Sequence, residues 1–185
     1  MLKASTLLVS LLMFVRPAQA QDAFSSIRCG ATISNTLIGK VMPQGRVVDI
    51  EIRHQELGLK DVGASEISSS LTFESWTICG NEYALLVDRR EVVRDVLLLP
   101  EHSRRRPRFL GSCEIAARKM PGAILAVLDN ISPLEGERHY ALADSTLLPA
   151  ISAWRIDEER LRFVKISSAN VRCPRNGIST IDGGP

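Results

Sequence analysis

Three histidines, His54, His102 and His139, are the side chains of this chain best suited to acid–base chemistry near neutral pH. A histidine beside a carboxylate can act as a general base. If His54 ends a strand, Glu56 shares its face and Glu51 does not. His54 or His102, with carboxylates brought in by the fold, would therefore serve a small hydrolase, although each also fits an ordinary surface or core position.

The densest cluster of charge lies in residues 101–108, where four arginines occupy five positions: Arg104, Arg105, Arg106 and Arg108. Guanidinium groups bind phosphate and carboxylate groups through several donors at once. Pro107 restricts the backbone, which lowers the cost of ordering this segment on binding. The cluster predicts a binding loop for an anionic partner, and the alternative is a solvated loop that binds nothing. No aromatic residue is interleaved with the arginines, so we predict no nucleic-acid partner.

The first twenty residues follow the three-part pattern of a signal peptide. Lys3 supplies the positive start, residues 7–15 are apolar apart from Ser10, and residues 18–20 form a small-x-small cleavage site. The apolar run is too short to span a bilayer, which needs about 20 residues. No other segment is long and apolar enough for a membrane span. We therefore predict an exported protein, periplasmic or secreted, that begins near Gln21.

Removal of this segment changes the charge of the chain. The whole sequence has 23 basic and 21 acidic residues, and residues 1–20 contain Lys3 and Arg16 but no acid. The mature chain is therefore neutral, so attraction to a polyanion must come from a local patch. The sequence contains no motif typical of a cofactor-binding, metal-binding or known catalytic site, and we predict neither a cofactor nor a metal.

The four cysteines lie in the exported part, and none are spaced as in a redox or zinc motif. An even number in an oxidising compartment predicts two disulfides, for which three pairings exist. We favour Cys29 with Cys79 and Cys113 with Cys173, each closing a long loop. The nested pairing, Cys29 with Cys173 and Cys79 with Cys113, remains open.

The elements that must position these side chains are mostly β-strands. Period-two alternation predicts a half-buried strand over Val47–His54, whereas residues 64–71 resemble a short helix capped by Ser65. Residues 76–99 predict a hairpin with a polar turn at 88–91. Further strands are expected at 124–128, 150–156 and 161–166, the last two joined by a charged turn.

These patterns predict one mainly β domain over residues 21–175, antiparallel and sandwich- or barrel-like, with one or two short helices and a flexible tail at 176–185. A disulfide-linked β scaffold that presents loops is typical of binding proteins. The function that we favour is a non-catalytic binding or inhibitor-like module of the cell envelope, whose partner is an anionic envelope component or protein. The alternative is a small exported hydrolase.

Overall fold

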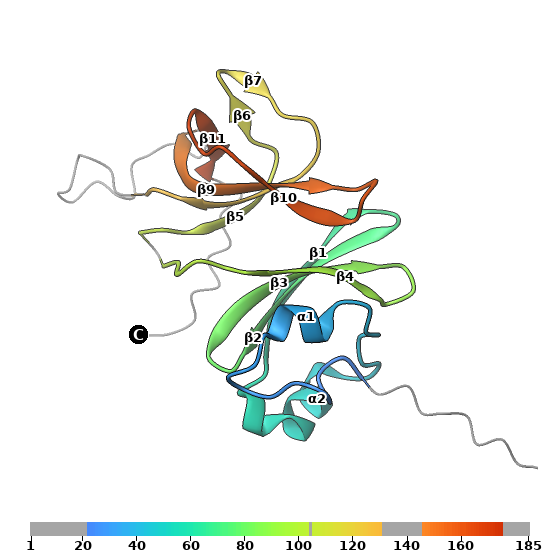
Figure 1. The fold of residues 1–185 in the computed structure, drawn as a ribbon. Helices are drawn as coiled ribbons and strands as arrows, with labels where there is room; N and C mark the ends of the chain where they lie inside the picture. The colour runs from blue at the N-terminus through green and yellow to red at the C-terminus, as the bar shows by residue number, and fades with distance from the viewer. Residues whose placement is uncertain (1–21, 104, 131–145, 176–185) are drawn as a thin grey trace, which may run out of the picture.

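The computed structural model describes residues 22–103, 105–130 and 146–175. The predicted signal peptide (1–20), the predicted tail (176–185), Arg104 and His139 lie outside the described residues. Within them, two antiparallel sheets stack face to face, and short helices cover the outer face of the first sheet (Figure 1). The mainly β, antiparallel fold predicted from the sequence is therefore confirmed.

The elements follow one another in three groups along the chain. The N-terminal layer contains α1 (Ile33–Leu37), α2 (Val47–Arg53) and a 3-10 turn, η1 (Gln55–Leu57). The first sheet contains β1 (Lys60–Ser68), β2 (Leu71–Ile78), β3 (Asn81–Asp88) and β4 (Val93–Leu98). The second sheet contains β5 (Arg108–Gly111), β6 (Glu114–Ile115), β7 (Arg118–Lys119), β8 (Ile124–Leu128), β9 (Leu147–Asp157), β10 (Arg162–Ile166) and β11 (Val171–Pro174).

The four strands of the first sheet lie in sequence order, β1-β2-β3-β4, which is the arrangement that consecutive hairpins produce. The hairpin between β2 and β3 has a two-residue loop, Cys79 and Gly80, with φ of 52° and 78°. Positive φ at both positions is the geometry of a type I′ turn, which matches the twist of the flanking strands. The hairpin predicted over residues 76–99 corresponds to the end of β2, β3 and β4.

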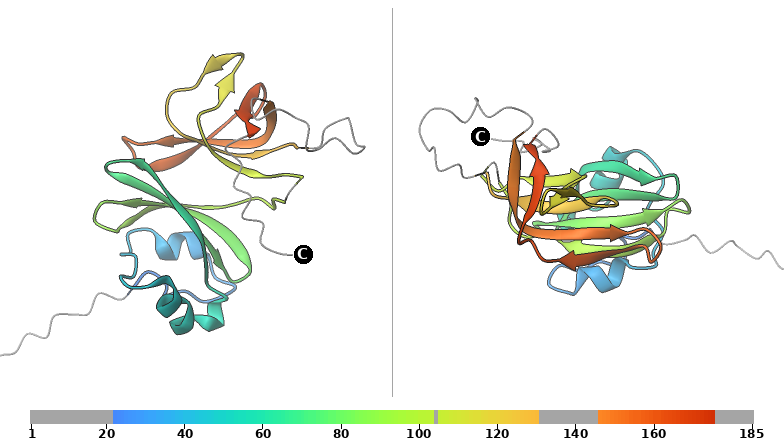
Figure 2. Two further views of the ribbon diagram at one scale, coloured as in Figure 1. Left: turned by 180° about the vertical axis from the view of Figure 1, so that it is seen from behind. Right: turned by 90° about the horizontal axis from the view of Figure 1, so that it is seen from above.

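This sheet is covered on both faces. Trp76, Leu85 and Val87 point toward the N-terminal layer, where they pack with residues such as Phe24 and Leu37. The opposite face carries Leu71, Phe73, Ala84 and Leu86, which pack against side chains of the second sheet, including Leu125 and Ile156. The views in Figure 2 show the same three layers from behind and from above. The central strand β3 is consequently buried from Tyr83 to Val87.

The second sheet has the order β5-β8-β9-β11-β6-β7, and β10 also pairs with β9. The long strand β9 changes its neighbours: residues 147–149 pair with β11, whereas residues 153–157 pair with β10. The sheet curls through this exchange and encloses a core of its own, which includes Phe109, Ile124, Leu128 and Val171. The strands predicted at 124–128, 150–156 and 161–166 are all present.

The strand predicted over Val47–His54 is wrong, because the segment forms helix α2. The helix buries one apolar side chain, Ile50, and leaves Val48 and Ile52 more than half exposed. Asp49 in its first turn and Arg53 in its last turn suit the helix dipole. The strand was predicted because the alternation was taken to place Val48, Ile50 and Ile52 together on the face toward the core.

The helix predicted over residues 64–71 is also wrong. Residues 60–68 form β1, which pairs with β2 and then turns at residues 69–70. Ile67 and Leu71, four residues apart, share a packing site, as they would on one face of a helix, but they reach it from the two arms of a hairpin.

The two disulfides join Cys29 to Cys79 and Cys113 to Cys173. The favoured pairing is thus confirmed, and the nested pairing is excluded. The first disulfide lies within residues 22–99, which form the N-terminal layer and the first sheet, and the second lies within residues 105–175, which form the second sheet. None of the helices in the described ranges is long and apolar enough to cross a membrane.

Candidate functional site

The connection between β4 and β5 carries the charge cluster that the sequence singles out. Ser103 and Arg106 face each other across a short β-bridge, in which the N–H of each donates to the carbonyl oxygen of the other at 3.1 and 3.0 Å. The Arg106 N–H also donates to the Ser103 hydroxyl oxygen at 3.3 Å. We call residues 103–106 the arginine turn. Its described arginines, Arg105 and Arg106, are exposed.

Backbone hydrogen bonds fix the arginine turn to the second sheet. The Arg105 carbonyl accepts from the N–H of Asn130 at 3.0 Å, and the Pro107 carbonyl accepts from the N–H of Leu128 at 2.9 Å. Leu128 is the last residue of the buried strand β8. The turn is therefore hydrogen-bonded to the end of a core strand. A backbone held in this way needs little further ordering to bind a ligand.

A side-chain network holds the other arm of the turn. His102 lies just before the turn, and its Nε2 is 2.9 Å from Oε2 of Glu82 on β3. Its Nδ1 lies 3.0 Å from the carbonyl oxygen of Pro100. Both ring nitrogens thus face acceptors, an arrangement that favours the protonated imidazole. The bond to Glu82 raises the pKa of His102 above its usual value, and partial burial opposes this effect.

Glu82 is the centre of this network, which we call the Glu82 cluster: Ser75, Glu82, His102 and Arg108. Its carboxylate accepts from the Ser75 hydroxyl, the Arg108 guanidinium and the His102 imidazole. Burial by itself raises the pKa of Glu82. The hydrogen bonds from His102 and Ser75 and the charge of Arg108 outweigh burial, so the pKa of Glu82 lies below its usual value.

The burial of Arg108 was not predicted from the sequence. We expected it to face solvent with the other arginines of the loop, but it is the first residue of β5 and is 9% exposed. Its guanidinium lies 5.8 Å from the centre of the Phe73 ring and binds Glu82 and Ser75 between the two sheets. Of the predicted binding residues that the structure describes, Arg105 and Arg106 are exposed and Arg108 is not, and Arg104 lies outside the described residues.

His54 belongs to a separate contact in the N-terminal layer. It is 8% exposed, and its Nε2 lies 3.3 Å from Oδ2 of Asp22. The other oxygen of Asp22 accepts from the N–H groups of Phe24 and Ser25, which closes a turn. The Phe24 ring packs edge-on against the imidazole. His54 therefore pairs with a carboxylate 32 residues earlier in the chain, and not with Glu56.

Neither histidine is arranged to activate a nucleophile. Ser75 is fully buried, and its hydroxyl donates to the Glu82 carboxylate and not to an imidazole nitrogen. In the described ranges no hydroxyl or thiol side chain bonds to His54 or His102. The described residues also contain no group of three His, Cys, Asp or Glu side chains that could hold a metal ion. The Glu82 cluster is suited to fixing the two sheets and the arginine turn.

The sequence interpretation missed Glu82 and Ser75. One signal pointed to Glu82: it shares a face of its strand with Ala84 and Leu86, so it places an acid on an apolar face. A buried carboxylate needs a cationic partner, and Arg108 and His102 supply one from the segment after β4. Pairing across 26 residues was not visible in any local pattern.

Comparisons with protein-family models, with curated proteins and with solved structures give no match for this chain.

Proposed function

We propose that the protein is a non-catalytic binding module of the cell envelope or exterior, and that it presents the arginine turn to an anionic partner. The observation that supports this proposal most strongly is the anchoring of the turn on both arms. The Glu82 cluster holds one arm, and hydrogen bonds to residues 128 and 130 hold the other. Exposed guanidinium groups on a fixed backbone bind phosphate or carboxylate groups at a low entropic cost.

The neutral charge of the mature chain agrees with a local interaction. Without a net positive charge, the molecule as a whole is not drawn to polyanions, so its affinity has to come from a local patch, to which Arg105 and Arg106 contribute. Such contacts are screened beyond about 8 Å at physiological ionic strength. Binding that depends on these two side chains will therefore weaken as salt is raised.

The experiment compares two double variants with equal loss of charge. One is Arg105→Ala with Arg106→Ala, and the control is Arg89→Ala with Arg90→Ala in the exposed turn between β3 and β4. Each is immobilised and tested for retention of anionic phospholipid vesicles and of native envelope extract, at low and high salt. We expect the first variant to lose salt-sensitive binding and the control to retain it. Equal binding by both variants would refute the proposal.

Export forms part of the same proposal. Two disulfides and a signal-peptide pattern support an oxidising compartment. N-terminal sequencing of the protein isolated from its host is expected to begin near Gln21, and a retained Met1 would contradict export by this route.

The alternative function, a small hydrolase using His54 or His102, is supported only by the pairing of each histidine with a carboxylate. Both imidazoles bind carboxylates, but neither has a nucleophile within reach in the described part of the chain.

A further inference from the structure

The two disulfides differ in their access to solvent. Cys113 and Cys173 are 1% and 0% exposed, within the core of the second sheet. Cys29, in contrast, is exposed, and Cys79 is partly buried. Exchange begins when an external thiolate reaches one sulfur of the disulfide, so access decides which of the two bonds can react in the folded protein.

The two sulfurs of the exposed disulfide are also unequal. Cys79 packs against the N-terminal core, and its backbone is held on both sides: its N–H donates to the Leu57 carbonyl at 2.6 Å, and its carbonyl accepts from the Asn81 side chain at 3.3 Å. Cys29 lies in a run, residues 28–32, whose members are all exposed. The greater exposure of Cys29 favours attack at its sulfur, with Cys79 as the leaving group.

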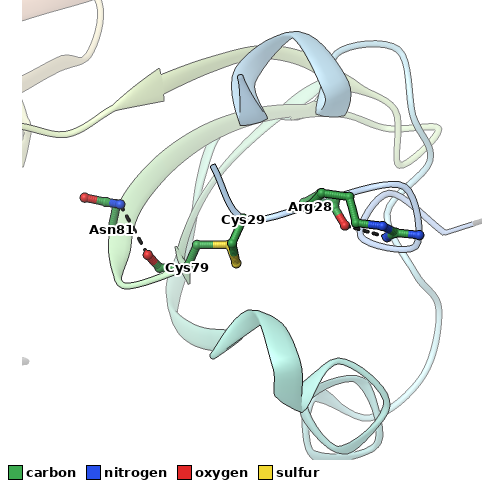
Figure 3. The surroundings of a disulfide bond; sticks show 5 residues. Arg28, Cys29, Cys79 and Asn81 are labelled. Atoms are coloured by element: carbon green, nitrogen blue, oxygen red, sulfur yellow. Dashed lines mark hydrogen bonds between the residues drawn. A yellow bond between two sulfur atoms is a disulfide. The ribbon is translucent and has the colours of Figure 1, made fainter. Parts of the chain in front are cut away.

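The surroundings of Cys29 leave this approach open. Figure 3 shows the side chain of the preceding residue, Arg28, directed away from the disulfide. Its guanidinium donates to the Ile27 carbonyl at 2.7 Å and to the Ser25 carbonyl at 3.4 Å. Arg28 is thereby kept beside its own turn and does not cover the sulfur.

We propose that the Cys29–Cys79 disulfide is a site of thiol–disulfide exchange with a dithiol protein of the Cys-x-x-Cys class. The thiolate of the partner bonds to the Cys29 sulfur, the bond between the two sulfurs breaks, and Cys79 leaves as a thiolate that takes up a proton. The second thiol of the partner then attacks the partner sulfur of the mixed disulfide and releases Cys29 as a thiol. The protein disulfide is reduced by two electrons, and the partner dithiol is oxidised to a disulfide.

Reduction would separate the segment 28–32 from the turn between β2 and β3, while most of the fold keeps its contacts. Backbone hydrogen bonds from Ala23 to Val41 and from Gly39 to Val93 do not involve the cysteines. The buried Cys113–Cys173 disulfide stays closed. The consequence is a local opening at one surface of the N-terminal layer, and this inference does not depend on the function proposed for the arginine turn.

The main measurement of the test uses the folded wild-type protein. The protein is incubated with a thioredoxin-class dithiol protein in which the second active-site cysteine is replaced by serine, so that the mixed disulfide is trapped. Free thiols are then alkylated and the peptides are mapped by mass spectrometry. We expect the trapped partner on Cys29 and the alkyl group on Cys79, with the two buried cysteines modified at least roughly tenfold more slowly.

A double variant, Cys29→Ser with Cys79→Ser, serves as the matched control and should capture no partner. Trapping on Cys113 or Cys173 at a comparable rate, trapping on Cys79, or no trapping on the wild-type protein would each overturn the proposal.

Discussion

The two halves of the molecule each contain one disulfide and one sheet, but they differ in how the sheet is packed and in whether the disulfide is exposed. In residues 22–99 a four-stranded sheet lies between two layers, and its disulfide joins two surface turns. In residues 105–175 the sheet curls around its own core, and its disulfide is part of that core. Similar loop lengths, 50 and 60 residues, therefore place one cross-link within reach of solvent chemistry and exclude the other from it.

Removing each disulfide in turn gives the largest expected effect. The chain-entropy model predicts a loss of about 4 kcal/mol for either loop. Replacing Cys113 and Cys173 by alanine also leaves a gap in a close-packed core, so we expect about 5 kcal/mol for this pair and about 4 kcal/mol for the pair Cys29 and Cys79. Urea unfolding of the two double variants measures the difference. A greater loss for the exposed pair would contradict the contrast between the halves.

The junction between the halves depends on Glu82. The substitution Glu82→Ala leaves the buried Arg108 guanidinium without its carboxylate, and we expect a loss of about 3 kcal/mol in the free energy of unfolding. Glu66→Ala, an exposed acid on β1, is the control and should cost less than about 0.5 kcal/mol. Adding Arg108→Met to Glu82→Ala should restore part of the loss, because the buried guanidinium is no longer left without a carboxylate. Additive losses in the double variant would rule out the coupling.

The N-terminal layer can be tested through α2. Ile50→Ala removes a buried side chain and should cost about 2 kcal/mol, whereas Ile52→Ala should change stability by less than about 0.5 kcal/mol, because Ile52 is 62% exposed. In a strand the two positions would share a face, so similar losses at both would support the strand and contradict the helix.

The smallest effect is the pH dependence of the Glu82 cluster. The folded pKa of Glu82 is below the unfolded value of 4.5, so its stabilisation is complete above that pH and is lost as the pH falls through the folded pKa. The folded pKa of His102 is above 6.5, so its stabilisation is complete below pH 6.5 and is lost as the pH rises through the folded pKa. Urea unfolding at several pH values should show the second loss in the wild type and not in His102→Gln. Identical profiles would show that the His102 contact contributes nothing.

Much of the fold could be predicted because the relevant signals are local. Turn residues and alternating side chains located the hairpin at 76–99 and the strands of the second half. The even number of cysteines predicted two disulfides, and the favoured pairing proved correct. Residues 47–54 and 64–71 failed because short apolar repeats fit both a helix and a strand, and tertiary packing decided between them. The apolar repeat in residues 47–54 does not show that Ile50 alone is buried.

The candidate site could be predicted only in part from the sequence. The exposed arginines of the turn were evident from composition. The burial of Arg108 and its pairing with Glu82 depend on how β5 stacks over β3, which is a contact between sheets that no local pattern records.

Amide hydrogen exchange in the free protein tests most directly whether the arginine turn is formed before any partner binds. The N–H groups of Ser103, Arg106 and Asn130 donate to backbone carbonyls that fix the turn. We predict that these three amides exchange at least roughly tenfold more slowly than an unstructured chain of the same sequence, and that Glu82→Gln accelerates the exchange of Ser103. Exchange of all three at the rate of an unstructured chain would contradict a turn that is formed in advance.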